Sequence, residues 1–340
     1  RLYLYTVMGA ALVPLLWGLA ELLRLLGRAV ASVAGSREMV GTEFVRNDLA
    51  FALSLVLVAF PIWIIHAWLA QRPIQGASAQ ATDERASWPR ATYFFLVLII
   101  TGSVACLQLY EVVQQLAGTA LANERTWGLA GAVAGLIIYG SAWLGHVWWR
   151  RSDLRAAPAR TANDWLTRAY LYGGLFVVAV AATLWFGTIA QIILGELVDT
   201  RAMWESWESW QQAIVSPLAG ALAASVAWLC QWTLAARLLQ ADPPMGPAHR
   251  ASRTRTGYFL AVVLVSATAV LILVSSSLRN VFAEVMGAWR PTEGSRLLED
   301  IGGPLVMVAP FALAWWWHWR RSAQEALAFD SPERRSAVLR

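Results

Sequence analysis

The chain is short of charge and has no lysine at all. Only 14% of its 340 residues are charged, and all 27 basic residues are arginine. Soluble globular domains carry about 25% charged residues, whereas a charge at the centre of a bilayer costs at least about 2.5–3.5 kcal/mol. With 58% hydrophobic residues, this composition excludes an ordinary soluble domain and predicts an integral membrane protein.

Several chemical signatures are missing too. The two cysteines, Cys106 and Cys230, lie inside apolar runs without metal-ligand spacing, which is typical of small buried side chains. The sequence contains no phosphate-binding glycine loop, nucleophile elbow, zinc-type His-Glu-x-x-His or hydrolase carboxylate pair. We therefore expect no enzymatic activity. Because the basic segments contain few aromatic residues, we expect membrane phospholipid, and not nucleic acid, as their acidic partner.

What the chain does have is eight long apolar runs. Each is long enough to cross about 30 Å of hydrocarbon, and none alternates as a barrel strand does. The sequence therefore predicts an all-α polytopic membrane protein with eight transmembrane helices. The runs cover about residues 2–26, 49–70, 93–117, 127–149, 169–194, 213–234, 258–282 and 301–319.

A short pattern closes every second run: a Trp, two residues, then His or Gln, followed by arginines. The copies are Trp63–His66, Trp143–His146, Trp228–Gln231 and Trp315–His318, and the arginines behind them are Arg72, Arg150, Arg151, Arg237, Arg320 and Arg321. The copies are 80, 85 and 87 residues apart (146−66, 231−146, 318−231). Recurrence at a nearly fixed interval indicates tandem duplication.

Each duplicated unit also opens alike, with an Arg and an aromatic residue four positions later. These pairs are Arg1/Tyr5, Arg90/Phe94, Arg168/Tyr172 and Arg255/Phe259. We predict four two-helix repeats at 1–72, 90–151, 165–240 and 253–322, joined by loops such as residues 72–90 and followed by a tail at 323–340. A two-helix unit leaves the membrane where it entered, so all copies share one orientation; a closed pseudo-fourfold bundle and an open arc both fit.

Charge predicts which way the repeats face. Eighteen of the 27 arginines fall on the side that holds both termini and the segments after each second helix, against nine on the other side. The positive-inside rule then places both termini, and the tail, in the cytoplasm. We expect the chain in a bacterial cytoplasmic (inner) membrane, with its acidic face outside.

The repeated histidines allow more than one interpretation. The simplest is an interfacial anchor, because Trp at i−3 shares a helix face with the His and arginines follow within a few turns. A second is axial ligation of a haem or chlorophyll-type pigment by His66, His146 and His318, although Gln231, a poor iron ligand, replaces the third copy. Proton or substrate handling is a third. The repeat-motif and anchor residues are Trp63, Trp143, Trp228, Gln231, Trp315, Arg72, Arg151, Arg237, Arg321, Tyr5, Phe94, Tyr172 and Phe259.

Polar residues inside the runs are few. Glu21 has Arg24 three positions on, which predicts a local ion pair, and Gln191 is expected to hydrogen-bond a neighbouring helix. No acid recurs at mid-depth in all four units, so the sequence shows no proton relay. Small residues three or four apart, as in Gly220 to Ser225, indicate close helix packing.

The opening Arg-Leu-Tyr-Leu-Tyr at 1–5 and the stretch Pro-Ile-Trp-Ile-Ile-His-Ala-Trp at 61–68 carry a family likeness. They resemble a bacterial polytopic membrane family of unknown function, built of tandem two-helix repeats that open with Tyr-x-Tyr and close with Trp-x-x-His-Trp. The resemblance covers essentially the whole chain. It implies the fold and implies no activity.

Three functions are compatible with these patterns. The first is a non-enzymatic membrane scaffold or accessory subunit of a larger complex, with bound phospholipid and with protein partners or self-association in the membrane. The second is a tetrapyrrole- or quinone-binding electron-transfer or pigment subunit that uses the repeated histidines. The third is a small-solute transporter or channel along a pseudo-symmetry axis.

Overall fold

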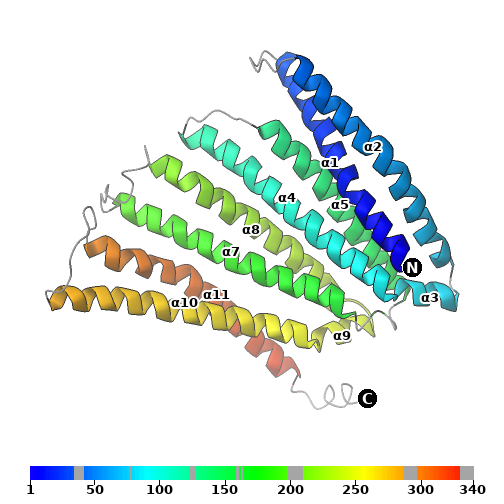
Figure 1. The fold of residues 1–340 in the computed structure, drawn as a ribbon. Coiled ribbons are helices and arrows are strands. Elements are labelled where there is room, and N and C mark those ends of the chain that lie inside the picture. The colour runs from blue at the N-terminus through cyan, green and yellow to red at the C-terminus, as the bar shows by residue number, and fades with distance from the viewer. Residues whose placement is uncertain are drawn as a thin grey trace. The chain divides into compact units, whose positions relative to one another are not determined.

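The computed structural model describes residues 1–33, 42–76, 78–122, 128–157, 161, 164–197, 210–286 and 297–329. Within these ranges the chain is helical, which confirms the all-α prediction. The long helices are α1 (Leu2–Val33), α2 (Thr42–Gln71), α4 (Trp88–Ala122), α5 (Leu129–Ala156), α7 (Trp165–Leu197), α8 (Trp210–Leu239), α10 (Arg253–Val285) and α11 (Leu297–Phe329) (Figure 1). Shorter elements are η1 (Arg72–Ile74), α3 (Ala79–Arg85) and α9 (Met245–Arg250).

Seven of the long helices in the described ranges are long and apolar enough to cross a membrane. The chain is therefore a multi-pass membrane protein. The exception is α11. The mean hydropathy of its apolar run is lowered by Gly302, Gly303, Pro304 and Pro310 and by the tryptophans and histidine of Trp315–His318 at its end. The eighth crossing stays a prediction.

The long helices extend past the apolar runs at both ends. They contain 28 to 35 residues, which corresponds to about 42–52 Å at 1.5 Å per residue. That length exceeds the hydrocarbon and reaches through the head-group layers. The added turns carry the polar residues that the apolar pattern alone assigns to loops. The predicted tail is an example, because α11 continues through residues 323–329; residues 330–340 lie outside the described part.

The chain divides into two compact units. The first comprises Arg1–Val112, Trp127–Tyr170 and Leu238–His249, and the second Val113–Thr126, Leu171–Arg237 and Arg250–Arg340. In the first unit α1 packs along both α2 and α5. Its core joins α1, α2 and α4 through Tyr5, Met8, Leu12, Leu16, Ala67, Ala70, Tyr93, Phe94 and Val97.

The second unit has a comparable core where α7, α8 and α10 meet. Its members are Tyr172, Leu175, Ala235, Tyr258, Phe259 and Val262. Away from this core, α10 packs along α11, and side-chain to backbone hydrogen bonds link the helices. The Gln191 amide donates to the carbonyl of Gly303 (3.2 Å), and the Ser277 hydroxyl donates to that of Ile301 (2.9 Å). The helix-to-helix bond expected of Gln191 is confirmed.

The segment at 72–90 differs from the predicted loop, because η1 and α3 occupy most of it. Ser78 caps α3, and its hydroxyl accepts a hydrogen bond from the N–H of Ala81 at 3.1 Å. Ala81 and Glu84 point inward and are buried. A seven-residue helix is too short for its periodicity to stand out in the sequence, yet α3 delivers Glu84 to the polar network described below.

Close helix packing at Gly220 yields the first prediction. A Cβ at Gly220 in α8 would overlap the rigid indole of Trp185 in α7, whereas a Cβ at Gly140 in α5 would meet no atom within 4 Å. Gly220→Ala should therefore lower the unfolding temperature of the purified protein in detergent. Gly140→Ala should leave it unchanged or raise it, because Ala favours a helix by about 1 kcal/mol over Gly. Equal effects of the two changes would contradict the packing.

Candidate functional site

In the first unit, Tyr93 at the start of α4 and His146 near the end of α5 form a buried pair. The Tyr93 hydroxyl lies 2.9 Å from His146 Nε2, and His146 Nδ1 lies 2.7 Å from the carbonyl oxygen of Ala142, one turn back on its own helix. A carbonyl can only accept, so Nδ1 carries the proton and Nε2 accepts from the hydroxyl. Both ring nitrogens are thus engaged: Nδ1 fixes the ring on α5, and Nε2 holds α4 against α5.

The second unit contains the same arrangement. The Tyr258 hydroxyl of α10 donates to His318 Nε2 of α11 at 2.8 Å, and His318 Nδ1 donates to the carbonyl of Ala314 at 2.7 Å. Phe259 lies beside the His318 ring, with centroids 6.1 Å apart, as Phe94 lies beside His146 at 6.3 Å. The sequence singles out the histidines, but not the tyrosines that bind them.

The third candidate, His66 in α2, is only half-buried. Its Nδ1 lies 2.7 Å from the carbonyl of Ile62, so the three histidines share one backbone contact four residues upstream. Its ring faces the edge of Tyr3 at 6.3 Å. For His146 and His318, binding an iron or magnesium would require the tyrosine hydroxyl to leave Nε2. Among the described residues no cluster of three His, Cys, Asp or Glu is arranged to hold a metal ion.

Three of the four closing-motif tryptophans connect neighbouring helices. Trp143 Nε1 donates to the Tyr170 hydroxyl at 2.6 Å in the first unit, and Trp228 Nε1 lies 3.5 Å from the Tyr258 hydroxyl in the second. Trp63 packs on the first core, which includes Tyr93. Trp315 is exposed. Three of the four predicted motif tryptophans therefore join helices within a unit, and one faces outward.

The aromatic residues predicted to open the repeats all lie in the cores. Tyr5, Phe94, Tyr172 and Phe259 are each buried. Their contacts with the other helices of each unit make them core residues.

The remaining predicted anchors are more varied. The Gln231 amide lies against Gly174 of α7, where a Cβ would approach Nε2 to 2.7 Å. Arg72 is exposed, and its guanidinium lies 5.6 Å from the Trp68 ring. Arg237 and Arg321 are exposed, and Arg151 is half-buried. A head-group position for these arginines stays a prediction.

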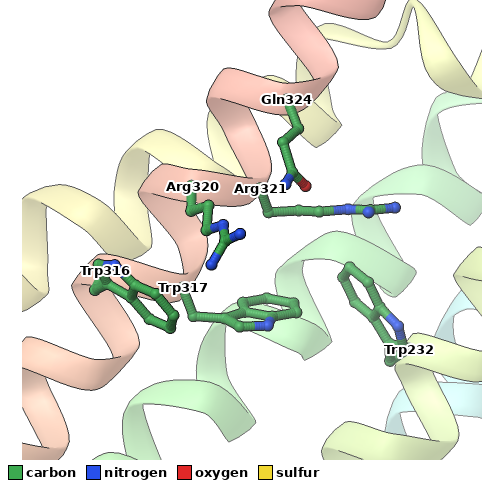
Figure 2. A pocket seen from close by; sticks show the side chains of 6 residues that line it. All are labelled: Trp232, Trp316, Trp317, Arg320, Arg321 and Gln324. Carbon is green, nitrogen blue, oxygen red and sulfur yellow. The ribbon is translucent and has the colours of Figure 1, made fainter.

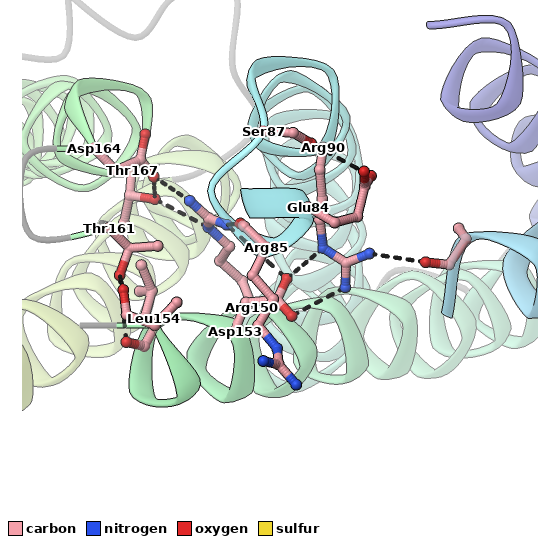
Figure 3. A network of polar contacts seen from close by, with 12 residues as sticks. Glu84, Arg85, Ser87, Arg90, Arg150, Asp153, Leu154, Thr161, Asp164 and Thr167 are labelled. Carbon is pink, nitrogen blue, oxygen red and sulfur yellow. Dashed lines mark hydrogen bonds and ion pairs between the residues drawn. The ribbon is translucent and has the colours of Figure 1, made fainter. Parts of the chain in front are cut away.

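A fully buried arginine organises one end of the first unit. Arg90 is 0% exposed, and its Nε and Nη2 bind the two carboxylate oxygens of Asp153 at 2.6 and 3.0 Å (Figure 3). Its Nη1 donates to the Tyr5 hydroxyl at 3.1 Å and approaches the Ala70 carbonyl at 3.4 Å. One guanidinium thus ties together α1, α2, α4 and α5, and its bidentate geometry suits a carboxylate.

A ring of further polar contacts closes around this pair. The Tyr5 hydroxyl donates to Glu84 at 3.0 Å, and Arg1 pairs with the same carboxylate at 2.7 Å. On the other side, Arg150 pairs with Asp164 and donates to the carbonyl of Arg85 at 3.3 Å (Figure 3). Asp153, Asp164 and Glu84 are absent from the sequence-predicted site. The spacing of Asp153 three residues after Arg150 is a local signal, but the pairing of Asp153 with Arg90 and of Glu84 with Arg1 joins residues far apart in the sequence.

The two units share their central contacts at a constant sequence offset. Arg90 and Arg255 are 165 residues apart (255−90) and lie over Phe94 and Phe259, each at 5.5 Å. The pairs Trp63/Trp228, Ala70/Ala235, Tyr93/Tyr258 and Val97/Val262 have the same offset. Equivalent positions in the two halves therefore make equivalent packing contacts.

The buried pair yields the second prediction. Arg90→Gln leaves the Asp153 carboxylate buried without its guanidinium, and losing one member of a buried pair costs about 3–5 kcal/mol. Denaturant unfolding in detergent should register that loss. Arg155→Gln, an exposed position on the same helix as Asp153, should change stability by less than about 0.5 kcal/mol. Matching losses in the two variants would rule out the central role of Arg90.

Comparison with known proteins gives a match to one family model. No solved structure and no curated protein is similar to the chain. The profile of the domain of unknown function DUF5671 matches residues 1–127 and 168–313, and the second stretch begins at Arg168, the predicted opening arginine of the third repeat. With most of its length matched, this multi-pass membrane chain belongs to the DUF5671 family.

Proposed function

We propose that the protein is a non-enzymatic scaffold or accessory subunit of a larger membrane complex. The observation that carries the proposal is that its buried charged and polar side chains contact one another or neighbouring helices. Arg90, Asp153 and Glu84 bind one another or neighbouring helices, and His146 and His318 bind tyrosines. An enzyme or carrier would present such side chains to a ligand, whereas in this chain they hold helices together.

The same contacts weigh against the alternatives. A tetrapyrrole or metal ligand needs an imidazole nitrogen with an available lone pair, and both nitrogens of His146 and His318 are hydrogen-bonded in the resting arrangement. A proton-coupled transporter needs an ionisable group within the membrane, and the strongest buried pair, Arg90–Asp153, lies at helix ends close to the chain's arginine-rich segments.

We further propose that the scaffold consists of four two-helix repeats in one orientation, with α11 as the eighth crossing. Two observations support this: the constant offset of 165 residues between equivalent core contacts, and a family model that matches two separate stretches, 1–127 and 168–313. The arginine distribution favours a bacterial inner membrane with both termini in the cytoplasm. Exposed tryptophans near helix ends, such as Trp68, Trp88 and Trp165, suit the head-group layer.

The outward helix faces are where a scaffold would meet its partners. Leu57 on α2 is 70% exposed, Leu144 on α5 is 60% exposed and Leu264 on α10 is 68% exposed. In lipid such faces are solvated by acyl chains, which rearrange around a larger side chain. A packed partner helix does not rearrange so readily, since protein interiors tolerate overpacking poorly.

The third prediction follows from this difference. Extracted from its native membrane in mild detergent, the chain should migrate in a stoichiometric complex well above its own 37.4 kDa. Leu→Trp is made singly at positions 57, 144 and 264. The substitution at the position that meets a partner should release the chain from the complex. The unfolding temperature of the isolated chain should stay unchanged. Size-exclusion chromatography with mass measurement reads both.

Migration of the wild-type chain from native membranes as a lone monomer would contradict the scaffold proposal. A haem or pigment absorption band in the purified protein would instead support ligation by the repeated histidines.

A further inference from the structure

The second unit contains a pocket of about 400 Å³ whose lining is chemically distinctive. Trp232 of α8 forms one side, and Trp316, Trp317, Arg320, Arg321 and Gln324 of α11 form the rest (Figure 2). This volume is within the range of small-molecule sites. Its six lining residues are three indoles, two guanidiniums and one amide, and none of them is acidic.

The indoles form a fixed apolar wall. Trp232 stacks on Trp228 with centroids 5.4 Å apart and planes at 11°, and Trp317 meets both rings edge-on at 5.2 and 5.6 Å. Trp317 also contacts the ring of His318 at 4.6 Å. Because His318 is itself held by Tyr258, the wall is connected to the core of the unit and is formed before any ligand arrives.

The opposite part of the pocket is positive. The Arg320 guanidinium lies 5.4 Å from the Trp316 ring, and the Arg321 side chain extends between Gln324 and the indoles of Trp317 and Trp232 (Figure 2). An aromatic cage alone would suit a quaternary ammonium, but two guanidiniums repel a cation. Guanidinium and amide donors together match the oxygens of a phosphate group.

The depth of the pocket matches a phospholipid. The last apolar run ends at Trp319, and the two arginines come directly after it, so the guanidiniums fall at the level of the head groups while the indoles face the outer part of the hydrocarbon. A phosphate on the arginines would place a glycerol and its first acyl carbons against Trp232 and Trp317.

The first half of the chain lacks this pocket's residues. When the halves are aligned on His146 and His318, a shift of 172 residues (318−146), Trp317 corresponds to Gly145, and Arg320 and Arg321 correspond to Trp148 and Trp149.

Trp149 has a different task, because it covers the Arg90 guanidinium at 5.4 Å and packs on Phe94 at 5.3 Å. The set of indoles and arginines in the second half therefore goes beyond what the shared core of the two halves requires.

We propose that this pocket binds the phosphate of a phosphate ester, with an anionic phospholipid as its ligand. The arginines and Gln324 bind the phosphate oxygens, and the tryptophans accept the apolar part. The site does not depend on the scaffold role, but its depth at the head groups rests on the proposed membrane crossing of α11.

The test uses the full chain in detergent with equimolar phosphatidylglycerol and phosphatidylcholine, read by native mass spectrometry. The wild type should retain phosphatidylglycerol preferentially.

R320Q/R321Q should weaken that binding roughly twenty-five-fold, because each basic side chain at an anionic lipid contributes about fivefold. The control R46Q/R279Q removes two exposed arginines that are neither pocket residues nor predicted head-group anchors, and it should change binding less than about twofold. R320K/R321K keeps the charge, should retain part of the affinity, and decides the matter if the glutamine variant fails to fold.

A further arm identifies the source of the phosphate. Excess inorganic phosphate that leaves phosphatidylglycerol bound assigns the site to lipid, and displacement by inorganic phosphate assigns it to a soluble phosphate ester. Equal retention of the two lipids by the wild type, or equal loss of phosphatidylglycerol in R320Q/R321Q and R46Q/R279Q, would overturn the proposal.

Discussion

The rest of the structure depends on one constraint: lipid cannot hydrogen-bond to the chain, so buried polar groups are stabilised by partners within the protein. The backbone meets this demand through long helices. The side chains meet it through pairs such as Tyr93–His146 and Tyr258–His318, in which each imidazole nitrogen has a partner. Even serine and glutamine inside the apolar segments bond to a carbonyl of another helix, as Ser277 and Gln191 do.

The same constraint explains why the ion pair of Arg90 is so completely enclosed. A buried charge is tolerated only with excellent geometry and additional hydrogen bonds. Arg90 has a bidentate carboxylate, a hydroxyl and two flanking aromatic rings, Phe94 and Trp149. Such a network adds little net stability over an apolar substitute of similar volume. It does specify which helix ends meet. In a bundle of uniformly apolar helices, that specificity matters more than additional hydrophobic contact.

The helices could be predicted from the sequence, because apolar length is a one-dimensional signal; the repeats inferred from recurrence stay a proposal. The buried faces could not. Helices that are apolar all round have no stripe to point inward, so the sequence alone favours the lipid interface for Tyr5, Phe94, Tyr172 and Phe259, whereas the structure buries them. Nor could the partners of Arg90 and Tyr93 be found, since pairing across 53 to 85 residues depends on how each helix is rotated. The histidines were visible as a pattern, and their role depends on those tyrosines.

The central claim is that every two-helix unit crosses the lipid and returns to the side on which it began. Single cysteines placed by Arg155→Cys and Glu205→Cys, in a chain whose Cys106 and Cys230 are replaced by serine, test it most directly with a membrane-impermeant thiol reagent. The account predicts that the cysteine at 155 reacts only when the cytoplasmic side is opened, and the cysteine at 205 reacts in intact cells. Reaction of both from the same side would contradict it.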